Sequence, residues 1–240
     1  MTTKAALVTG ASSGIGLAIA RMLAEEGHGV TMVARRPEKL AQAAAALAAQ
    51  GLDVAEVAAD VRAEAAIVAA VAAHRDRYGQ LDVLVNNAGI GVAQAPGELT
   101  TKMLDLQLNV NLRAVPLFYR ECLPLLRAAA AEHRAALVVN LASIAAQRPE
   151  GWLAVYSAAK AGVVAYTEAM NRVLAPKGIR SCALCPAFVD TAMTDWVKGD
   201  VPAGEMIRPQ DVAELVRALL RLSPNCVVPV IPLLRPGDAY

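Results

Sequence analysis

The sequence has little excess of charge of either sign. Its 240 residues include 23 basic and 22 acidic side chains, so its formal net charge is +1. Lysine and arginine are scattered and form no basic runs. Because a protein that binds nucleic acid needs a basic patch to neutralise phosphates, we expect no nucleic-acid partner.

Long apolar runs are also missing, although 56% of the residues are hydrophobic. A membrane-spanning helix needs about 20 consecutive apolar residues. The apolar stretch near the N-terminus is interrupted by three glycines, and no polar cleavage region follows it, which argues against a signal peptide. We therefore expect a soluble protein with no membrane partner.

The four cysteines show no pattern typical of disulfides. Cys182 and Cys185 form a C-x-x-C motif, but no second pair of ligands lies at metal-binding spacing. We expect them to be small buried apolar residues, with no metal site. Unpatterned cysteines are typical of proteins in a reducing compartment, so a cytoplasmic location is expected.

Short β-rich runs alternate with helical stretches along the whole chain. The runs predict strands at about 4–9, 30–34, 54–60, 81–87, 135–143, 179–185 and 226–231. The intervening stretches predict helices at about 14–27, 37–50, 63–78, 153–175 and 210–222, with a further long helical stretch between the fourth and fifth strands. This alternation indicates an α/β fold of one domain, 1–240, with a doubly wound seven-stranded parallel sheet and helices on both faces. The polar segment at about 190–208 follows the carboxyl end of a strand, where ligands bind in such sheets, and is expected to be a flap.

A glycine-rich turn, TGASSGIG (9–16), lies between the first strand and the first helix. Gly10 permits the sharp turn, Gly14 lets backbone approach a pyrophosphate, and Gly16 lets the helix pack closely on the strand. The helix N-terminus then presents N–H groups to the phosphates. The turn predicts a dinucleotide site.

The end of the second strand indicates which dinucleotide fits. NAD sites usually place a carboxylate there, whereas this sequence has Ala34 followed by Arg35 and Arg36. Arginine offers a planar fork of donors that suits a 2′-phosphate. The alternative is that both arginines are merely solvated, but the missing carboxylate favours NADP(H).

The motif YSAAK (156–160) places Tyr156 and Lys160 on one face of a helix. A lysine charge near a phenol stabilises the phenolate and would lower the pKa of Tyr156 toward neutrality. Ser143 lies at the end of the fifth strand, where it can bond a substrate oxygen, and Asn111 lies early in the long helix.

These elements resemble the short-chain dehydrogenase/reductase family in order and spacing, over essentially the whole chain. The resemblance rests on TGASSGIG, Asp60, NNAG (86–89), NVNL (109–112), the NLAS serine, YSAAK and PAFVDT (186–191). It implies a Rossmann-type fold, an NADP(H)-dependent hydride transfer to or from a small carbonyl or alcohol substrate, and a homodimer or homotetramer.

The resemblance also implies roles for individual residues. Tyr156 would be the general acid in reduction, Ser143 would polarise the carbonyl, and Lys160 would also bind the nicotinamide ribose. The Asn111 main chain would hold a water in a proton relay. The other expected cofactor contacts are Gly10, Ser12, Ser13, Gly14, Ile15, Gly16, Arg35, Arg36, Asp60, Val61, Asn87, Ala88, Gly89, Pro186, Val189 and Thr191.

The sequence departs from the family's usual pattern in two places. Ala187 stands where the family usually has glycine, and the chain lacks the glycine-rich C-terminal segment usual in acyl-carrier-protein reductases of the family.

The alternative to an enzyme is a catalytically idle dinucleotide sensor, but such proteins usually lose the tyrosine or the lysine. Five apolar residues near the expected site indicate either an apolar pocket or ordinary packing of the flap: Trp152, Phe188, Met193, Trp196 and Met206.

Pro116 follows Asn111 by five positions within the predicted long helix. Proline has no N–H and clashes with the carbonyl four residues back, here that of Leu112. We therefore expect shifted hydrogen bonding between Asn111 and Pro116, which would free a carbonyl for the relay water. The alternative is that the proline is merely tolerated.

The pair of arginines gives a first test. We expect Arg35→Ala to weaken NADPH binding by about 1–3 kcal/mol, the scale of a lost charged hydrogen bond, and to leave NADH binding nearly unchanged. Fluorescence titration of both cofactors measures this. Equal affinity of the unsubstituted protein for NADPH and NADH would contradict the prediction.

Overall fold

A seven-stranded parallel sheet forms the centre of the protein. The computed structural model describes residues 4–133 and 135–238. The strands lie in the order β3-β2-β1-β4-β5-β6-β7, and every neighbouring pair is parallel. Their bounds are β1 Ala5–Thr9, β2 Gly29–Ala34, β3 Val54–Ala58, β4 Val83–Asn86, β5 Ala136–Leu141, β6 Ile179–Pro186 and β7 Val230–Leu233. The order reverses between β1 and β4, which opens a crevice at their carboxyl ends.

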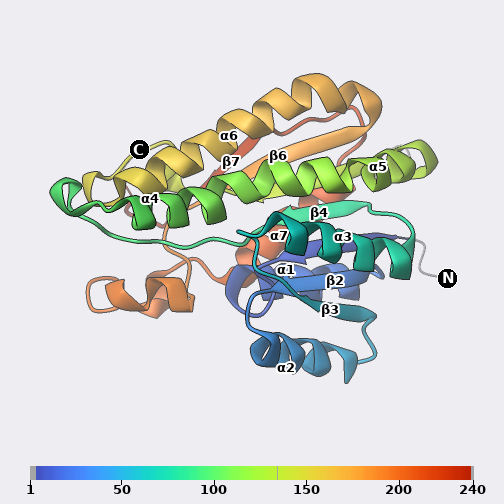
Figure 1. The fold of residues 1–240 in the computed structure, drawn as a ribbon, viewed down its shortest axis with the longest axis horizontal. Coiled ribbons are helices and arrows are strands. Elements are labelled where there is room, and N and C mark those ends of the chain that lie inside the picture. The colour runs from blue at the N-terminus through green and yellow to red at the C-terminus, as the bar shows by residue number, and fades with distance from the viewer. Residues whose placement is uncertain (1–3, 134, 239–240) are drawn as a thin grey trace.

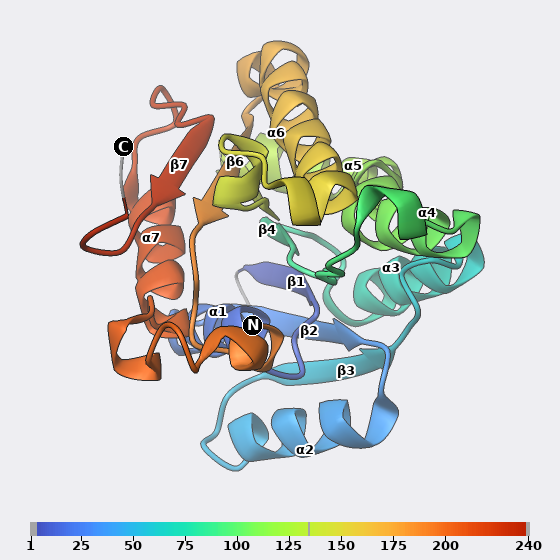
Figure 2. The ribbon, with the colours of Figure 1, turned by 90° about the vertical axis from the view of Figure 1, so that its left-hand side faces the viewer.

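Helices cover both faces of this sheet, as the sequence predicts (Figures 1 and 2). On one face pack α1, α2 and α7, and on the other pack α3, α5 and α6. The bounds are α1 Gly14–Glu25, α2 Pro37–Ala48, α3 Glu64–Tyr78, α4 Thr101–Leu108, α5 Ala114–His133, α6 Ala154–Leu174 and α7 Pro209–Arg221. The strands β1, β2, β4, β5 and β6 are buried at every position, because both of their faces lie under helices. The Rossmann-type doubly wound fold is confirmed.

The helix that follows the glycine turn is covered by the last helix of the chain. Apolar side chains of α1 and α7, including Ile19, Leu23 and Val216, belong to one buried cluster. At the edge of this contact Arg217 Nε lies 2.9 Å from a carboxylate oxygen of Glu26. Residues nearly two hundred positions apart in the sequence therefore close the same layer.

The long helical stretch before β5 is divided by a π-helical turn, η2 (Asn109–Arg113), between α4 and α5. The Ala114 N–H bonds the Asn109 carbonyl five residues back, instead of the usual four. The donor of this bond, Ala114, lies within the stretch from Asn111 to Pro116 where shifted bonding was expected, whereas its acceptor, Asn109, precedes that stretch. Since Pro116 has no N–H, it can pair neither with Leu112 at α-helical spacing nor with Asn111 at π-helical spacing.

The predicted position of the last strand is wrong by a few residues, because the observed strand begins later in the sequence. The predicted strand at 226–231 is observed as β7, Val230–Leu233, which pairs with β6 from Ala183 onward. The residues before it serve another purpose, because the buried Arg180 donates from Nη1 to the carbonyls of Ser223 and Cys226, at 2.9 and 3.0 Å. Val227 is exposed, and the main chain first bonds β6 at the Pro229 carbonyl, which accepts from the Ala183 N–H at 2.9 Å.

The segment expected as a flap leaves β6 and returns beside its own start. It forms the short helices η6 (Ala192–Val197) and η7 (Ala203–Glu205). A bridge between Val189 and Ile207 closes its base, with Ile207 N–H donating to the Phe188 carbonyl at 3.0 Å. Figure 2 shows this orange segment beyond the carboxyl end of β6.

Within the described residues, no helix combines the length and apolarity that crossing a membrane requires.

Candidate active site

The crevice between β1 and β4 is held by hydrogen bonds between their carboxyl ends. Buried Thr9 accepts at Oγ1 from the main-chain N–H groups of Asn87 and Ala88, at 2.9 and 3.0 Å. In return the Asn87 side-chain amide donates to the carbonyls of Thr9 and Gly10, at 3.0 and 3.2 Å. These bonds fix the two strand ends against each other.

The glycine turn depends on close approaches that a side chain would block. Gly10 and Gly14 adopt φ values of 66° and 57°, in the left-handed region where glycine is favoured. A Cβ on Gly16 would lie 2.4 Å from both the Asn87 amide nitrogen and the Gly10 carbonyl oxygen. Gly16 is buried below the turn, whereas α1 begins at Gly14 and directs its N-terminus at the crevice. The turn therefore leaves open space where phosphates would meet main-chain N–H groups.

A cavity of about 260 Å³ extends from this turn along the ends of β2 and β3. It is lined by the following predicted cofactor residues: Gly10, Ser12, Ser13, Gly14, Ile15, Arg35, Arg36, Asp60, Val61, Asn87, Ala88, Gly89 and Thr191. Arg35 and Arg36 are exposed at its rim, directly after the buried Ala34. The cavity thus has cationic groups, and no carboxylate, at the position that follows β2.

Asp60 is already paired within this region. Arg62 donates from Nε and Nη2 to the Asp60 carboxylate, with its Nη2 2.5 Å from Oδ2. These hydrogen bonds lower the pKa of Asp60 below its usual value, and the charge of Arg35 acts in the same direction. Asp60 therefore stays ionised beside the rim arginines.

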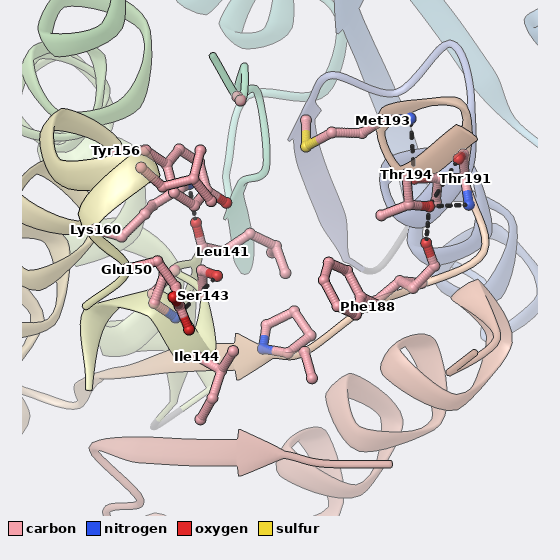
Figure 3. A pocket seen from close by; sticks show the side chains of 18 of the residues that line it. Leu141, Ser143, Ile144, Glu150, Tyr156, Lys160, Phe188, Thr191, Met193 and Thr194 are labelled. Carbon is pink, nitrogen blue, oxygen red and sulfur yellow. Dashed lines mark hydrogen bonds between the residues drawn. The ribbon is translucent and has the colours of Figure 1, made fainter. Parts of the chain in front are cut away.

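A second cavity, of about 500 Å³, contains the predicted catalytic side chains Ser143, Tyr156 and Lys160 (Figure 3). Pro186 and Val189 also line it, and it shares Ile15, Asn87, Gly89, Thr191 and Met193 with the first cavity. The two cavities are therefore neighbours along one crevice.

Tyr156 and Lys160 lie one turn apart near the start of α6, and Ser143 follows β5. The Lys160 ammonium nitrogen lies 5.7 Å from the centre of the Tyr156 ring. It donates to the Leu141 carbonyl at 2.6 Å, a bond that Figure 3 shows beside Ser143. The helix and the strand end therefore bring all three groups to one wall of the cavity.

The protonation of this wall differs from the sequence expectation. Burial raises the pKa of Tyr156 above its usual value, and a hydrogen bond with Ser143 opposes that rise. Burial also lowers the pKa of Lys160 to about 8. The expected lowering of the Tyr156 pKa by Lys160 is not seen in the protein alone, because both groups are desolvated and the ammonium bonds Leu141. At neutral pH the phenol is protonated.

Asn111 lies behind the cavity, in the π-helical turn. It is buried, and its side-chain amide bonds both the N–H and the carbonyl of Ile90, each at 2.9 Å. A Cβ added to Gly89 would lie 3.2 Å from the Asn111 side-chain oxygen and 3.6 Å from the Lys160 nitrogen. Asn111, Gly89 and Lys160 are thus brought together, although Asn111 does not line either cavity.

A chain of buried polar groups that the sequence reading missed supports α6. The Asn86 amide donates to Asn140, which donates to Thr167, which donates to the Val163 carbonyl, at 2.8, 2.8 and 2.7 Å. Asparagines near the carboxyl ends of the apolar strands at 81–87 and 135–143 could have signalled this chain, because buried amides need partners.

The apolar residues expected near the site divide into two groups. Trp152, Phe188, Met193 and Trp196 line the larger cavity, whereas Met206, near the end of the flap, is buried and does not line it. Both cysteines of the C-x-x-C motif are buried in β6 with free thiols, as expected. No group of metal-ligating side chains occurs among residues 4–133 and 135–238.

Gly16 offers a direct test of the turn. Gly16→Ala must displace either Asn87 or the Gly10 carbonyl, so we expect a loss of about 1–3 kcal/mol of stability from overpacking. NADPH affinity should fall at least tenfold by fluorescence titration (about 1.4 kcal/mol). In Gly97→Ala the added Cβ meets no atom within 4 Å, and this control should change neither quantity. Unaltered NADPH binding in Gly16→Ala would contradict the role of the turn.

Comparison with known proteins agrees with this geometry. The family described as short chain dehydrogenase matches residues 4–201. A Streptomyces virginiae protein named as a ketoacyl reductase of the monensin polyketide synthase is 37% identical over 235 residues, 90% of this chain and 89% of its own.

Three solved structures are similar over nearly all of both chains. A variant of actinorhodin polyketide ketoreductase with NADPH has a TM-score of 0.88 and 35% identity, covering 97% of each chain. A ketoacyl-(acyl-carrier-protein) reductase from Brucella melitensis with NADH has a TM-score of 0.87 and 34% identity, covering 96% of each. A short chain dehydrogenase from Burkholderia cenocepacia with NADP has a TM-score of 0.85 and 31% identity, covering 96% of this chain and 95% of its own.

The first and third of these neighbours hold NADPH and NADP, in agreement with the expected cofactor, and the second holds NADH. The family match extends from β1 through the glycine turn and the wall of Tyr156 and Lys160 to the flap. The protein is therefore an oxidoreductase that belongs to the short-chain dehydrogenase/reductase family.

Proposed function

We propose that this protein transfers a hydride between NADP(H) and a ketone, an aldehyde or the corresponding alcohol, with carbonyl reduction as its main reaction. The observation that supports this most directly is the junction of the two cavities. The crevice that the glycine turn opens continues into the cavity that holds Ser143, Tyr156 and Lys160. A dinucleotide in that crevice would end beside the protonated phenol.

The crevice fits such a cofactor. The pyrophosphate would lie at the glycine turn, where Gly14 lines the cavity without a side chain. Arg35 and Arg36 would hold the 2′-phosphate, while Asp60 and Val61 would contact the adenine. When bound, the nicotinamide would supply the hydride. Lys160 would hold its ribose, and Pro186, Val189 and Thr191 would lie along the ring.

The side chains of the wall would provide the proton and the orientation. Ser143 would hold the carbonyl oxygen by a hydrogen bond, and Tyr156 would donate its proton to that oxygen. The high pKa of the buried Tyr156 keeps the phenol protonated for this step. Charged Lys160 would stabilise the phenolate that remains.

The proton would be restored from the side of Asn111. We propose that the Asn111 carbonyl holds a water that connects Lys160 with solvent. The support is geometric: Asn111 lies in the π-helical turn beside Gly89 and Lys160, and the residue five positions on is a proline without an N–H. The Asn111 side chain, which bonds Ile90, would keep this carbonyl in place.

The idle-sensor alternative is less consistent with the site. A sensor has no need for a protonated phenol, a buried lysine and a hydroxyl on one wall of a 500 Å³ cavity.

We also propose that residues 1–240 act as one catalytic unit and assemble as a homodimer or homotetramer. The free cysteines are consistent with a reducing, cytoplasmic setting.

Replacing the phenol tests the function. Tyr156→Phe keeps the ring and removes the proton donor, so we expect turnover to fall by about 10²–10⁴-fold, the usual contribution of general acid catalysis. NADPH binding should stay within about threefold, a change below 1 kcal/mol. Stopped-flow oxidation of NADPH with a panel of ketones and aldehydes measures the rate.

Tyr166→Phe provides a matched control, because Tyr166 lies on the same helix and does not line the cavity. It should keep turnover close to that of the unsubstituted protein. If Tyr156→Phe kept more than about a tenth of the rate, general acid catalysis would not depend on this tyrosine.

A second substitution tests the relay. Pro116→Ala restores an N–H that can bond the Leu112 or Asn111 carbonyl, so we expect turnover to fall more than NADPH affinity. Pro124→Ala is the control, since Pro124 lies farther along the same helix, inside α5. Equal turnover in both variants would leave Pro116 without a part in proton transfer.

A further inference from the structure

Three aromatic side chains that contact one another line the larger cavity. The sequence has two tryptophans and two phenylalanines, and both tryptophans and one phenylalanine line this cavity. The ring centres of Trp152 and Trp196 lie 5.1 Å apart at 75°, and those of Phe188 and Trp196 lie 6.2 Å apart at 79°. We call these three residues the aromatic wall. Its edge-to-face contacts are those that aromatic rings prefer.

The aromatic wall is also exposed to solvent. Trp152 is 38% exposed and Trp196 is 61% exposed. Large aromatic surface that is left in water is unfavourable and is typical of a binding surface. Because this surface continues into the cavity that holds Tyr156, its ligand is expected to be the substrate rather than a separate molecule.

The segments that carry Trp152 and Trp196 are each held by hydrogen bonds or ion pairs. The Trp152 carbonyl accepts from the Gln94 N–H at 2.9 Å. Trp196 lies on η6, whose start is capped by Thr191 and whose end is tied back by Lys198, 3.0 Å from Asp190.

Phe188 is supported from the C-terminal side. The Arg235 guanidinium carbon lies 5.5 Å from the centre of the Phe188 ring, and Arg235 pairs with Asp238 at 2.8 Å. The C-terminal segment, where this chain departs from the glycine-rich pattern, thus braces one side of the aromatic wall. Contacts within the protein therefore support each segment that carries a ring of the aromatic wall.

The geometry points to the class of substrate. Figure 3 shows Phe188 and Met193 across the cavity from Tyr156 and Ser143. Asp238, which also lines the cavity, is paired with Arg235, and Arg148 and Glu150 add one charge of each sign to the lining. We propose that the site binds a neutral carbonyl compound with a planar aromatic ring system, which packs against Trp152, Phe188 and Trp196 while its carbonyl reaches Tyr156. This inference rests on the proposed function for the position of the carbonyl.

Binding to the enzyme loaded with NADP⁺ tests the inference without turnover. Acetylnaphthalene and its saturated analogue acetyldecalin share one carbon skeleton, so they differ in the aromatic rings. Calorimetric titration should show acetylnaphthalene binding about tenfold more tightly, as expected when several aromatic contacts are gained. Trp152→Leu and Trp196→Leu keep apolar bulk, and each should remove most of that preference while acetyldecalin binding changes by less than about twofold.

Met193→Leu is the matched control, since Met193 lines the same cavity and is not aromatic. It should change both affinities by the same factor. Equal affinity of the unsubstituted enzyme for the two ketones, or no binding of either, would overturn the proposal, as would equal losses in the tryptophan variants. A clear preference for acetylnaphthalene without its reduction by NADPH would instead contradict the proposed function and leave this inference standing.

Discussion

The site depends first on the bonds that join the carboxyl ends of β1 and β4. The strand order reverses between these strands, so the crevice opens directly at their carboxyl ends. Thr9 and Asn87 exchange hydrogen bonds across it, and Asn87 also bonds the Gly10 carbonyl. Because the same amide lies against Gly16, it connects the turn, the first helix and the end of the fourth strand.

A second set of buried hydrogen bonds supports the side of the cavity that holds Ser143, Tyr156 and Lys160. The chain from Asn86 through Asn140 to Thr167 joins two central strands to the middle of α6. Tyr156 and Lys160 lie at the start of that helix, so their distance from Ser143 is set by strands rather than by loops. A site built on regular elements keeps its groups in position without cost at the moment of reaction.

Sequence reasoning recovered the architecture because five of the seven strands are buried at every position and therefore appear as apolar runs, while Gly14 and Pro37 mark the starts of the first two helices. It failed where tertiary contacts override such signals. The run 226–229 has strand composition, yet the Cys226 carbonyl bonds Arg180 and the strand begins only at Val230. The Tyr156 pKa was misjudged for a related reason, since spacing reveals the neighbouring lysine but not the burial of both groups. The roles assigned to Arg35, Arg36 and Asn111 stay predictions.

The contact between α1 and α7 has a consequence for how the chain is made. During synthesis α1 and the strands around it emerge early, whereas α7 lies near the far end of the sequence. Until α7 has left the ribosome, Ile19, Leu23 and their apolar neighbours have no cover on that side. A nascent chain therefore lacks this cover until α7 has emerged, and transiently exposed apolar surface of this kind favours aggregation. The native layer can close only after α7 has been synthesised.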